Sequence, residues 1–187
     1  MTRKFILWKR LDVPGHDVAR LWFQDLFWCL EGTAIFLEDR KTCRLDYQVF
    51  CDTAWKTVSG KVLGWVGEKS IDVQFAANPD GRWMLNGMEC EAVKKCVDID
   101  LSFTPATNLL PIRRLQLPIG QEAGVRSAWL KFPSFTLEIL KQTYHHTGPG
   151  TYRYEAFDGE FVKELTVDED GVVTHYPDLW VAESEGF

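Results

Sequence analysis

The stretch Cys43–Asp52, CRLDYQVFCD, alternates between two kinds of side chain along its whole length. One face carries Cys43, Leu45, Tyr47, Val49 and Cys51, and the other carries Arg44, Asp46, Gln48, Phe50 and Asp52. Successive side chains of a strand point to opposite sides, so a period of two predicts a strand with one buried and one solvated face. Such strands are typical of antiparallel sheets.

The same alternation recurs along the chain. It is clear in Val97–Thr104 and Ser70–Phe75, and turn sequences such as NPDG at 78–81 and DEDG at 168–171 separate the runs. Weaker strands are predicted at Lys4–Lys9, Ala34–Glu38, Lys56–Val66, Arg82–Met88, Ile112–Leu117, Val125–Phe132, Thr151–Phe157, Phe161–Val167 and Val172–His175. Only Ser134–Tyr144 has helical spacing, and a strand fits it as well. Many short strands predict a mainly β fold: a sandwich, a barrel or a partly closed barrel.

Composition and charge are those of a single globular domain. The chain has 187 residues, 45% of them hydrophobic and 26% charged, which suits one domain over residues 1–187. A net charge of −6 argues against nucleic acid and anionic membrane surfaces as partners, because both attract clustered Lys and Arg. The oligomeric state stays open between monomer and dimer.

No targeting or membrane-spanning segment is recognisable in the sequence. The apolar run after Lys4 stops at Lys9, short of the about 7–15 apolar residues of a secretory signal. No run reaches the about 18 apolar residues of a membrane span. The sequence therefore predicts a cytoplasmic protein whose five cysteines stay reduced. It has no metal-ligand spacing, nucleotide-binding glycine loop or nucleophile motif, so no metal, cofactor or catalytic residue is predicted.

Acidic residues at two places are candidate ligand contacts. Asp52 and Trp55 lie where the strand 43–52 ends, and a carboxylate beside an indole suits a sugar, since Asp accepts from hydroxyl groups while the ring packs on C–H faces. The alternative is an Asp that caps a turn and a Trp that covers the edge of the core. Asp98 and Asp100 project from one strand face about 6–7 Å apart, a separation found in glycosidase carboxylate pairs. Carboxylates on such an exposed face are more often simply solvated.

Two adjacent arginines follow. If Ile112–Leu117 is a strand, Arg113 and Arg114 point to opposite faces. One of them then pairs with an aspartate of the strand before it, and the other is free to bind phosphate or carboxylate through two parallel hydrogen bonds. A purely structural ion pair is the competing interpretation.

Several segments, taken in order, carry a family resemblance. They are YQVFCDTAW at 47–55, VDIDLSFTPATN at 97–108, LPIRRL at 110–115, AWLKFP at 128–133, QTY at 142–144 and VTHYP at 173–177. Together they resemble the bacterial glycolipid-binding family, formerly a domain of unknown function, and the resemblance covers essentially the whole chain. It implies a single curved antiparallel sheet that forms a half-barrel, similar to those of bacterial lipoprotein carriers, with at most one or two short helices.

A half-barrel has a concave face that a helix, a loop or a ligand must fill. An apolar floor with a few polar groups at its mouth suits an amphiphile. We therefore expect a non-catalytic binding or carrier protein for a glycolipid or another amphiphilic small molecule. Its expected ligand contacts are Asp52, Trp55, Asp98, Asp100, Asn108, Arg113, Arg114 and Tyr144. Two alternatives remain: an enzyme that acts on a sugar or lipid headgroup through Asp98 and Asp100, and a protein-interaction module whose sheet edge or concave face takes a partner chain.

Overall fold

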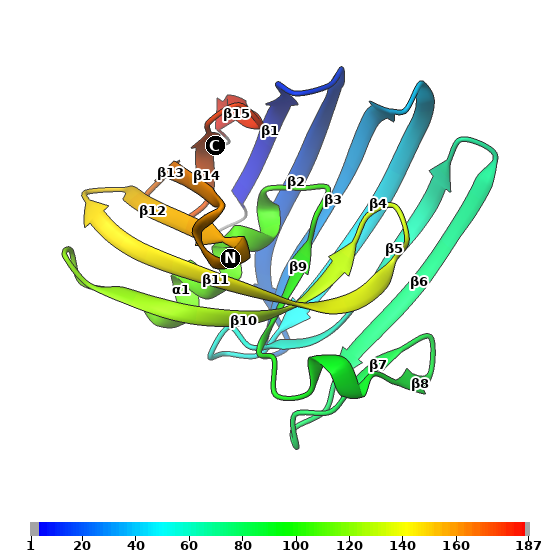
Figure 1. The fold of residues 1–187 in the computed structure, drawn as a ribbon, viewed down its shortest axis with the longest axis horizontal. Helices are drawn as coiled ribbons and strands as arrows, with labels where there is room; N and C mark the ends of the chain where they lie inside the picture. The colour runs from blue at the N-terminus through cyan, green and yellow to red at the C-terminus, as the bar shows by residue number, and fades with distance from the viewer. Residues whose placement is uncertain (1–3, 186–187) are drawn as a thin grey trace.

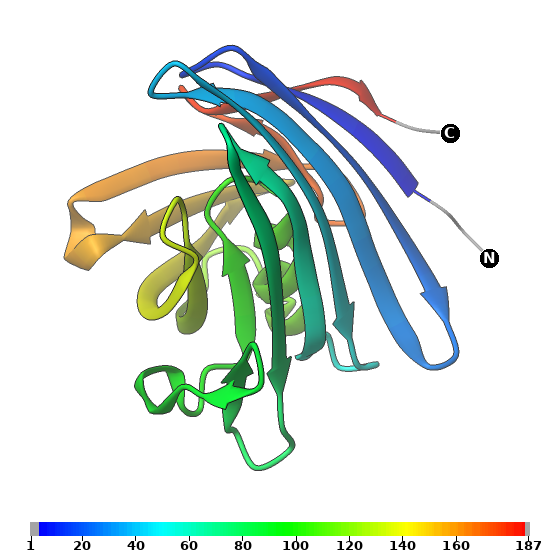
Figure 2. The ribbon, with the colours of Figure 1, turned by 90° about the vertical axis from the view of Figure 1, so that its right-hand side faces the viewer.

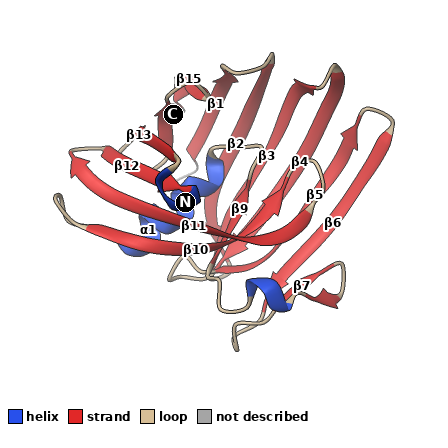
Figure 3. Ribbon diagram, viewed as in Figure 1, coloured by secondary structure: helices blue, strands red, loops and turns tan. Residues whose placement is uncertain are grey.

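The computed structural model describes residues 4–185, which form one curved 15-stranded sheet with short helical segments (Figures 1 and 3). The strands are β1 (Lys4–Arg10), β2 (Gly15–Gln24), β3 (Phe27–Glu38), β4 (Lys41–Cys51), β5 (Thr57–Val66), β6 (Lys69–Ala77), β7 (Trp83–Leu85), β8 (Met88–Glu89), β9 (Asp98–Leu101), β10 (Glu122–Lys131), β11 (Thr136–Gly148), β12 (Thr151–Ala156), β13 (Phe161–Val167), β14 (Val173–Tyr176) and β15 (Trp180–Glu185). The helical segments are α1 (Leu109–Leu115) and the 3₁₀ turns η1 (Glu91–Val93), η2 (Ala106–Asn108) and η3 (Phe157–Gly159).

The sheet is continuous but not closed. Its order is β8-β7-β6-β5-β4-β3-β2-β1-β15-β14-β13-β12-β11-β10-β9, so β1 pairs with β15 in the interior of the sheet. All neighbours are antiparallel except β9 and β10, which are parallel. Near the gap, the Thr57 N–H donates to the Val97 carbonyl (3.2 Å) and the Ile99 N–H donates to Thr57 Oγ1 (3.0 Å). These bonds bring β9 beside the start of β5. The curved, open sheet confirms the expected half-barrel.

The concave face is filled by the chain itself. Figure 2 shows the first strands arching over a helical segment, and residues 103–115, called the plug here, supply it. Every residue from Phe103 to Ile112 is buried. Leu109 packs among apolar side chains of β1 to β3, including Ile6, Trp8 and Leu30. The plug therefore serves as the core of the arch formed by these strands.

The structure corrects several of the predicted elements. Ile112–Leu117 is wrong as a strand, because residues 109–115 form α1. Pro111 lies in the first turn of that helix, where its missing N–H breaks no bond, and Gln116 ends the helix in a left-handed conformation (φ 45°). Strands β2 and β15 were not predicted. Ser134–Tyr144 is not a helix: β11 begins at Thr136 and runs through it.

A buried carboxylate fastens the plug to the sheet. Asp17 on β2 is 0% exposed, and the Tyr47 hydroxyl of β4 donates to it at 3.0 and 3.2 Å. Thr104 of the plug donates its hydroxyl to the same carboxylate and accepts the Ala106 N–H at 3.0 Å. No salt bridge is found for Asp17 within residues 4–185. Burial raises its pKa to about 7, although both hydroxyl donors act in the opposite direction.

Gly32 gives the Tyr47 side chain its path to Asp17. A Cβ added at this position on β3 would overlap the Tyr47 hydroxyl and the Val18 carbonyl oxygen. We expect Gly32→Ala to lower the free energy of unfolding by about 1–3 kcal/mol, the usual cost of overpacking, in urea titrations. Gly124→Ala is the matched control, because a Cβ there meets no atom within 4 Å. Equal effects of the two changes would contradict this account.

Candidate functional site: an aromatic cleft beside a buried polar network

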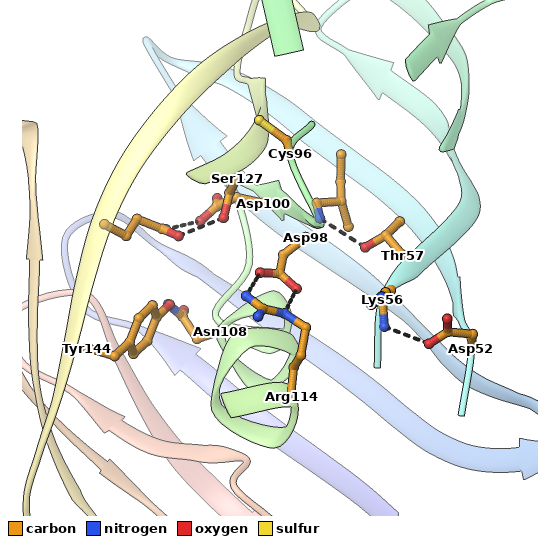
Figure 4. Close-up of polar contacts among 12 residues, drawn as sticks. Asp52, Lys56, Thr57, Cys96, Asp98, Asp100, Asn108, Arg114, Ser127 and Tyr144 are labelled. Atoms are coloured by element: carbon orange, nitrogen blue, oxygen red, sulfur yellow. Dashed lines mark hydrogen bonds and ion pairs between the residues drawn. The ribbon is translucent and has the colours of Figure 1, made fainter. Parts of the chain in front are cut away.

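Asp98 and Arg114 form a bidentate ion pair inside the half-barrel (Figure 4). Arg114 Nε and Nη2 donate to the two Asp98 carboxylate oxygens at 2.9 and 2.6 Å. The Asp98 side chain is fully buried and that of Arg114 is 20% exposed. Burial raises the pKa of Asp98 and the hydrogen bonds from Arg114 oppose this shift. The arginine that points inward is therefore Arg114, and it comes from a helix rather than from a strand.

Asp100 lies two residues further along β9 and has a different partner. Gln142 Nε2 on β11 donates to Asp100 Oδ2 at 2.7 Å and to the Tyr154 hydroxyl at 2.8 Å. Ser127 in turn donates its hydroxyl to Gln142 Oε1 at 2.7 Å, which fixes the orientation of the amide. Burial raises the pKa of Asp100 to about 6, and the nearby Asp98 charge adds to the shift. The expectation that Asp98 and Asp100 share a solvated face is wrong for Asp98, which is fully buried, while Asp100 is half-buried.

Asn108 and Tyr144 belong to the same interior network. Asn108 Nδ2 donates to the Tyr144 hydroxyl at 2.9 Å, and both side chains are buried. Burial is the main cause that raises the pKa of Tyr144 well above its usual value. Tyr154 and the charge of Asp100 raise it further. This bond links the end of η2 to β11, so both residues help to hold the plug in place.

The remaining predicted residues lie together in a separate group. Trp55 is stacked on Trp28, with ring centroids 4.3 Å apart, and the Arg113 guanidinium lies 5.0 Å from the Trp55 ring centroid. Asp52 Oδ1 accepts the backbone N–H groups of Ala54 and Lys56, both at 2.9 Å. Asp52 therefore has the turn-capping role that was weighed against sugar binding. Trp55 is buried at the edge of the core.

A cleft with aromatic walls opens beside the polar network. It has a volume of about 160 Å³. Its lining consists of Asp100, Leu101, Ser102, Thr104, Asn108, Trp129, Leu140, Tyr154, Phe157, Phe161, Tyr176, Leu179 and Trp180. The rings of Tyr154, Phe161 and Tyr176 pack with centroids 6.0 to 6.3 Å apart, mostly edge to face. Trp129 and Phe157, which also line the cleft, pack with ring centroids 5.7 Å apart.

Of the eight predicted contact residues, Asp100 and Asn108 line this cleft. The aromatic side chains of its walls were not predicted individually. The signal available was the total of 8 Trp and 12 Phe, which shows that aromatic surface is abundant but not where it gathers. Their convergence depends on how β10, β12, β13 and β14 curve, which is a property of the whole sheet.

A larger hollow, of about 560 Å³, lies on the outer face of the sheet across β1 to β5. Its lining mixes apolar side chains such as Val18 and Leu63 with cross-strand pairs such as Arg20 and Glu31. None of the predicted contact residues lines it. Its polar groups are largely engaged with one another, so the aromatic cleft is the better candidate site.

The structure defines a β half-barrel with an internal plug and a small aromatic cleft that contains a carboxylate. The chain belongs to the family described as "Putative glycolipid-binding", which it matches over residues 5–182. It is also similar to a protein of the DUF1089 family from Pseudomonas aeruginosa whose crystal structure is known. The two are 28% identical, the match covers 88% of this chain and 91% of that one, and the TM-score is 0.79. No protein of curated function matches this chain.

Two features of residues 4–185 bear on the kind of site. None of the helices in this range is long and apolar enough to cross a membrane. The same range holds no group of three or more His, Cys, Asp or Glu side chains arranged to hold a metal ion.

Proposed function

We propose that this protein binds a glycolipid or a similar amphiphile without chemical conversion, and that the ligand headgroup enters the aromatic cleft. The observation that carries the proposal is the meeting of several aromatic rings with one half-buried carboxylate, Asp100, in a single cleft. Aromatic faces pack on the C–H groups of sugars, and a carboxylate accepts hydrogen bonds from their hydroxyls. The family description supports the same class of ligand.

The size of the cleft limits what it holds. At about 160 Å³ it is smaller than the roughly 300–1,000 Å³ of drug-sized ligand sites. One headgroup ring is therefore its natural occupant. The plug already occupies the concave face over β1 to β3, so the apolar chain of the ligand lies outside the cleft while the plug is in place.

The arrangement of the carboxylates favours binding over glycoside hydrolysis. A glycosidase needs two carboxyl groups that flank the scissile bond. Asp98 is committed to Arg114 through two hydrogen bonds and is fully buried, and Asp100 alone lines the cleft. A cytoplasmic location and a carrier role stay predictions from the sequence and the resemblance.

Octyl β-glucoside, which joins one sugar ring to one apolar chain, is a direct probe of the proposal. We expect it to bind below its micelle concentration and to shift NMR signals of the cleft. Trp129→Ala should weaken binding about tenfold, because one ring face is lost. Trp65→Ala on the outer face is the matched control, because both tryptophans carry a basic side chain over the ring. Lys131 lies 5.3 Å from the Trp129 centroid, and Arg44 lies 5.3 Å from the Trp65 centroid. Signal changes confined to the outer face would refute the proposal.

A further inference from the structure

One oxygen of Asp100 is available to a ligand. Gln142 donates to Oδ2, whereas Oδ1 has no hydrogen bond within residues 4–185, and the residue lines the cleft. Arg114, the arginine of the buried network, is occupied by Asp98. The carboxylate thus enters the cleft without a cationic partner of its own. It would repel an anionic headgroup and attract a positive one.

The rings of the cleft complement the same charge. An aromatic face attracts an ammonium group through its quadrupole, and cages of several rings recognise quaternary ammonium ligands. Tyr154, Phe161 and Tyr176 form such a group of rings, with centroids within 6.3 Å of each other. Asp100 lines the same cleft as Tyr154 and Tyr176. Burial and then the charge of Asp100 raise the pKa of Tyr154, whereas for Tyr176 the causes are burial, then Tyr154, then Asp100.

Ammonium groups of the protein itself already lie over two rings of the cleft. Lys131 Nζ is 5.3 Å from the Trp129 ring centroid, and Lys163 Nζ is 5.7 Å from that of Phe161. Both lysines are also paired with carboxylates, Glu138 and Asp178 respectively. These contacts are independent of Asp100, and they show that the rings present faces suited to a cation.

We propose that the cleft selects a headgroup that bears an ammonium group, either an amino sugar or a choline-type headgroup. This inference rests on the proposed function and narrows its ligand class. In the bound state, Asp100 Oδ1 accepts from or faces the ammonium group, while the rings of Tyr154, Phe161 and Tyr176 surround its C–H surface. Phosphate and carboxylate headgroups are disfavoured by the same carboxylate.

The test compares glucose, glucosamine and choline as probes of the full chain, by NMR titration at neutral pH. We expect glucosamine and choline to bind at least about tenfold more tightly than glucose, from the added cation–π and charge interactions. The stronger of the two identifies the source of the ammonium group. Asp100→Asn keeps the shape of the side chain and should reduce glucosamine to the affinity of glucose. Phe161→Leu keeps an apolar wall and should weaken choline binding by a larger factor than glucose binding, because only choline loses a cation–π interaction.

The failures are distinguishable. If glucose binds the cleft as tightly as glucosamine, the ammonium preference is overturned and the proposed function stands. The same conclusion follows if neither variant weakens choline, provided that circular dichroism and thermal unfolding show both variants to be folded. If none of the probes, octyl β-glucoside included, changes any signal of the cleft, the proposed function fails together with the inference.

Discussion

Asp98→Ala is expected to lower the free energy of unfolding by about 3–5 kcal/mol, the usual cost of removing one partner of a buried ion pair. The Arg114 guanidinium would be left in the interior without the carboxylate that now binds both of its donors at 2.6 and 2.9 Å. The plug would lose its ion pair to β9 at the same time and keep the bond from the Leu101 N–H to Thr107 Oγ1. Chemical denaturation followed by Trp fluorescence measures the loss.

Two controls separate the ion pair from a general effect of losing an acidic side chain. Asp80→Ala removes a carboxylate that is paired with Arg82 at the surface, and its effect should be much smaller because solvent screens that pair. In the second, Asp98→Ala combined with Arg114→Met should recover part of the stability, since no buried charge is then left unpaired. A double variant less stable than Asp98→Ala alone would contradict the assignment.

Asp17 should make the protein less stable as the pH rises from about 4 to about 7. Burial raises its folded-state pKa from 3.8 to about 7, so within this window the folded state keeps a proton that the unfolded state has released. The free energy of unfolding then falls with pH, by about 4 kcal/mol in total from this group, and levels off above its folded pKa. Below the unfolded-state pKa of 3.8, Asp17 is protonated in both states and contributes its full stabilisation of the folded state.

Asp17→Asn isolates this effect, because Asp98 and Asp100 still titrate in both proteins. The difference in stability between the variant and the wild type should shift by about 4 kcal/mol in favour of the variant between pH 4 and pH 8. Urea titrations at several pH values measure it. Hydrogen exchange of residues 103–112 should follow the same trend, since Thr104 of the plug shares the carboxylate. Parallel pH profiles of the two proteins would rule out the role given to Asp17.

The strands were predictable where one face is buried and the other is solvated. Cys43–Asp52 is such a case, and β4 covers it as far as Cys51 with a regular alternation of burial. The plug was misread because its residues are buried on all sides, so its pattern carries no period of two. Leu109, Leu110 and Ile112 would suit a core strand as well as a core helix, and only the shape of the arch decides between them.

The site was predictable in part and for a physical reason. The interior position of Asp98 depends on its meeting Arg114, and Arg114 lies on α1, a segment that was expected to be a strand. Asp52 was expected to contact a ligand, with a turn cap as the alternative; the capping role could be weighed from sequence because it depends on immediate neighbours. The cleft was not foreseen, because its walls come from segments between residues 100 and 180 that only the curved sheet brings together.

The pairing of β1 with β15 has a consequence for how the chain reaches this state. Residues near 6 and 185 must meet before the joint between the two halves of the sheet exists. Contacts so distant in sequence close late and slow folding, because the loop entropy is lost before the contact forms. During synthesis β1 therefore waits for nearly the whole chain to emerge, with one of its edges open to pairing with another molecule. A circular permutant that joins these two ends directly would make that contact local and should fold faster.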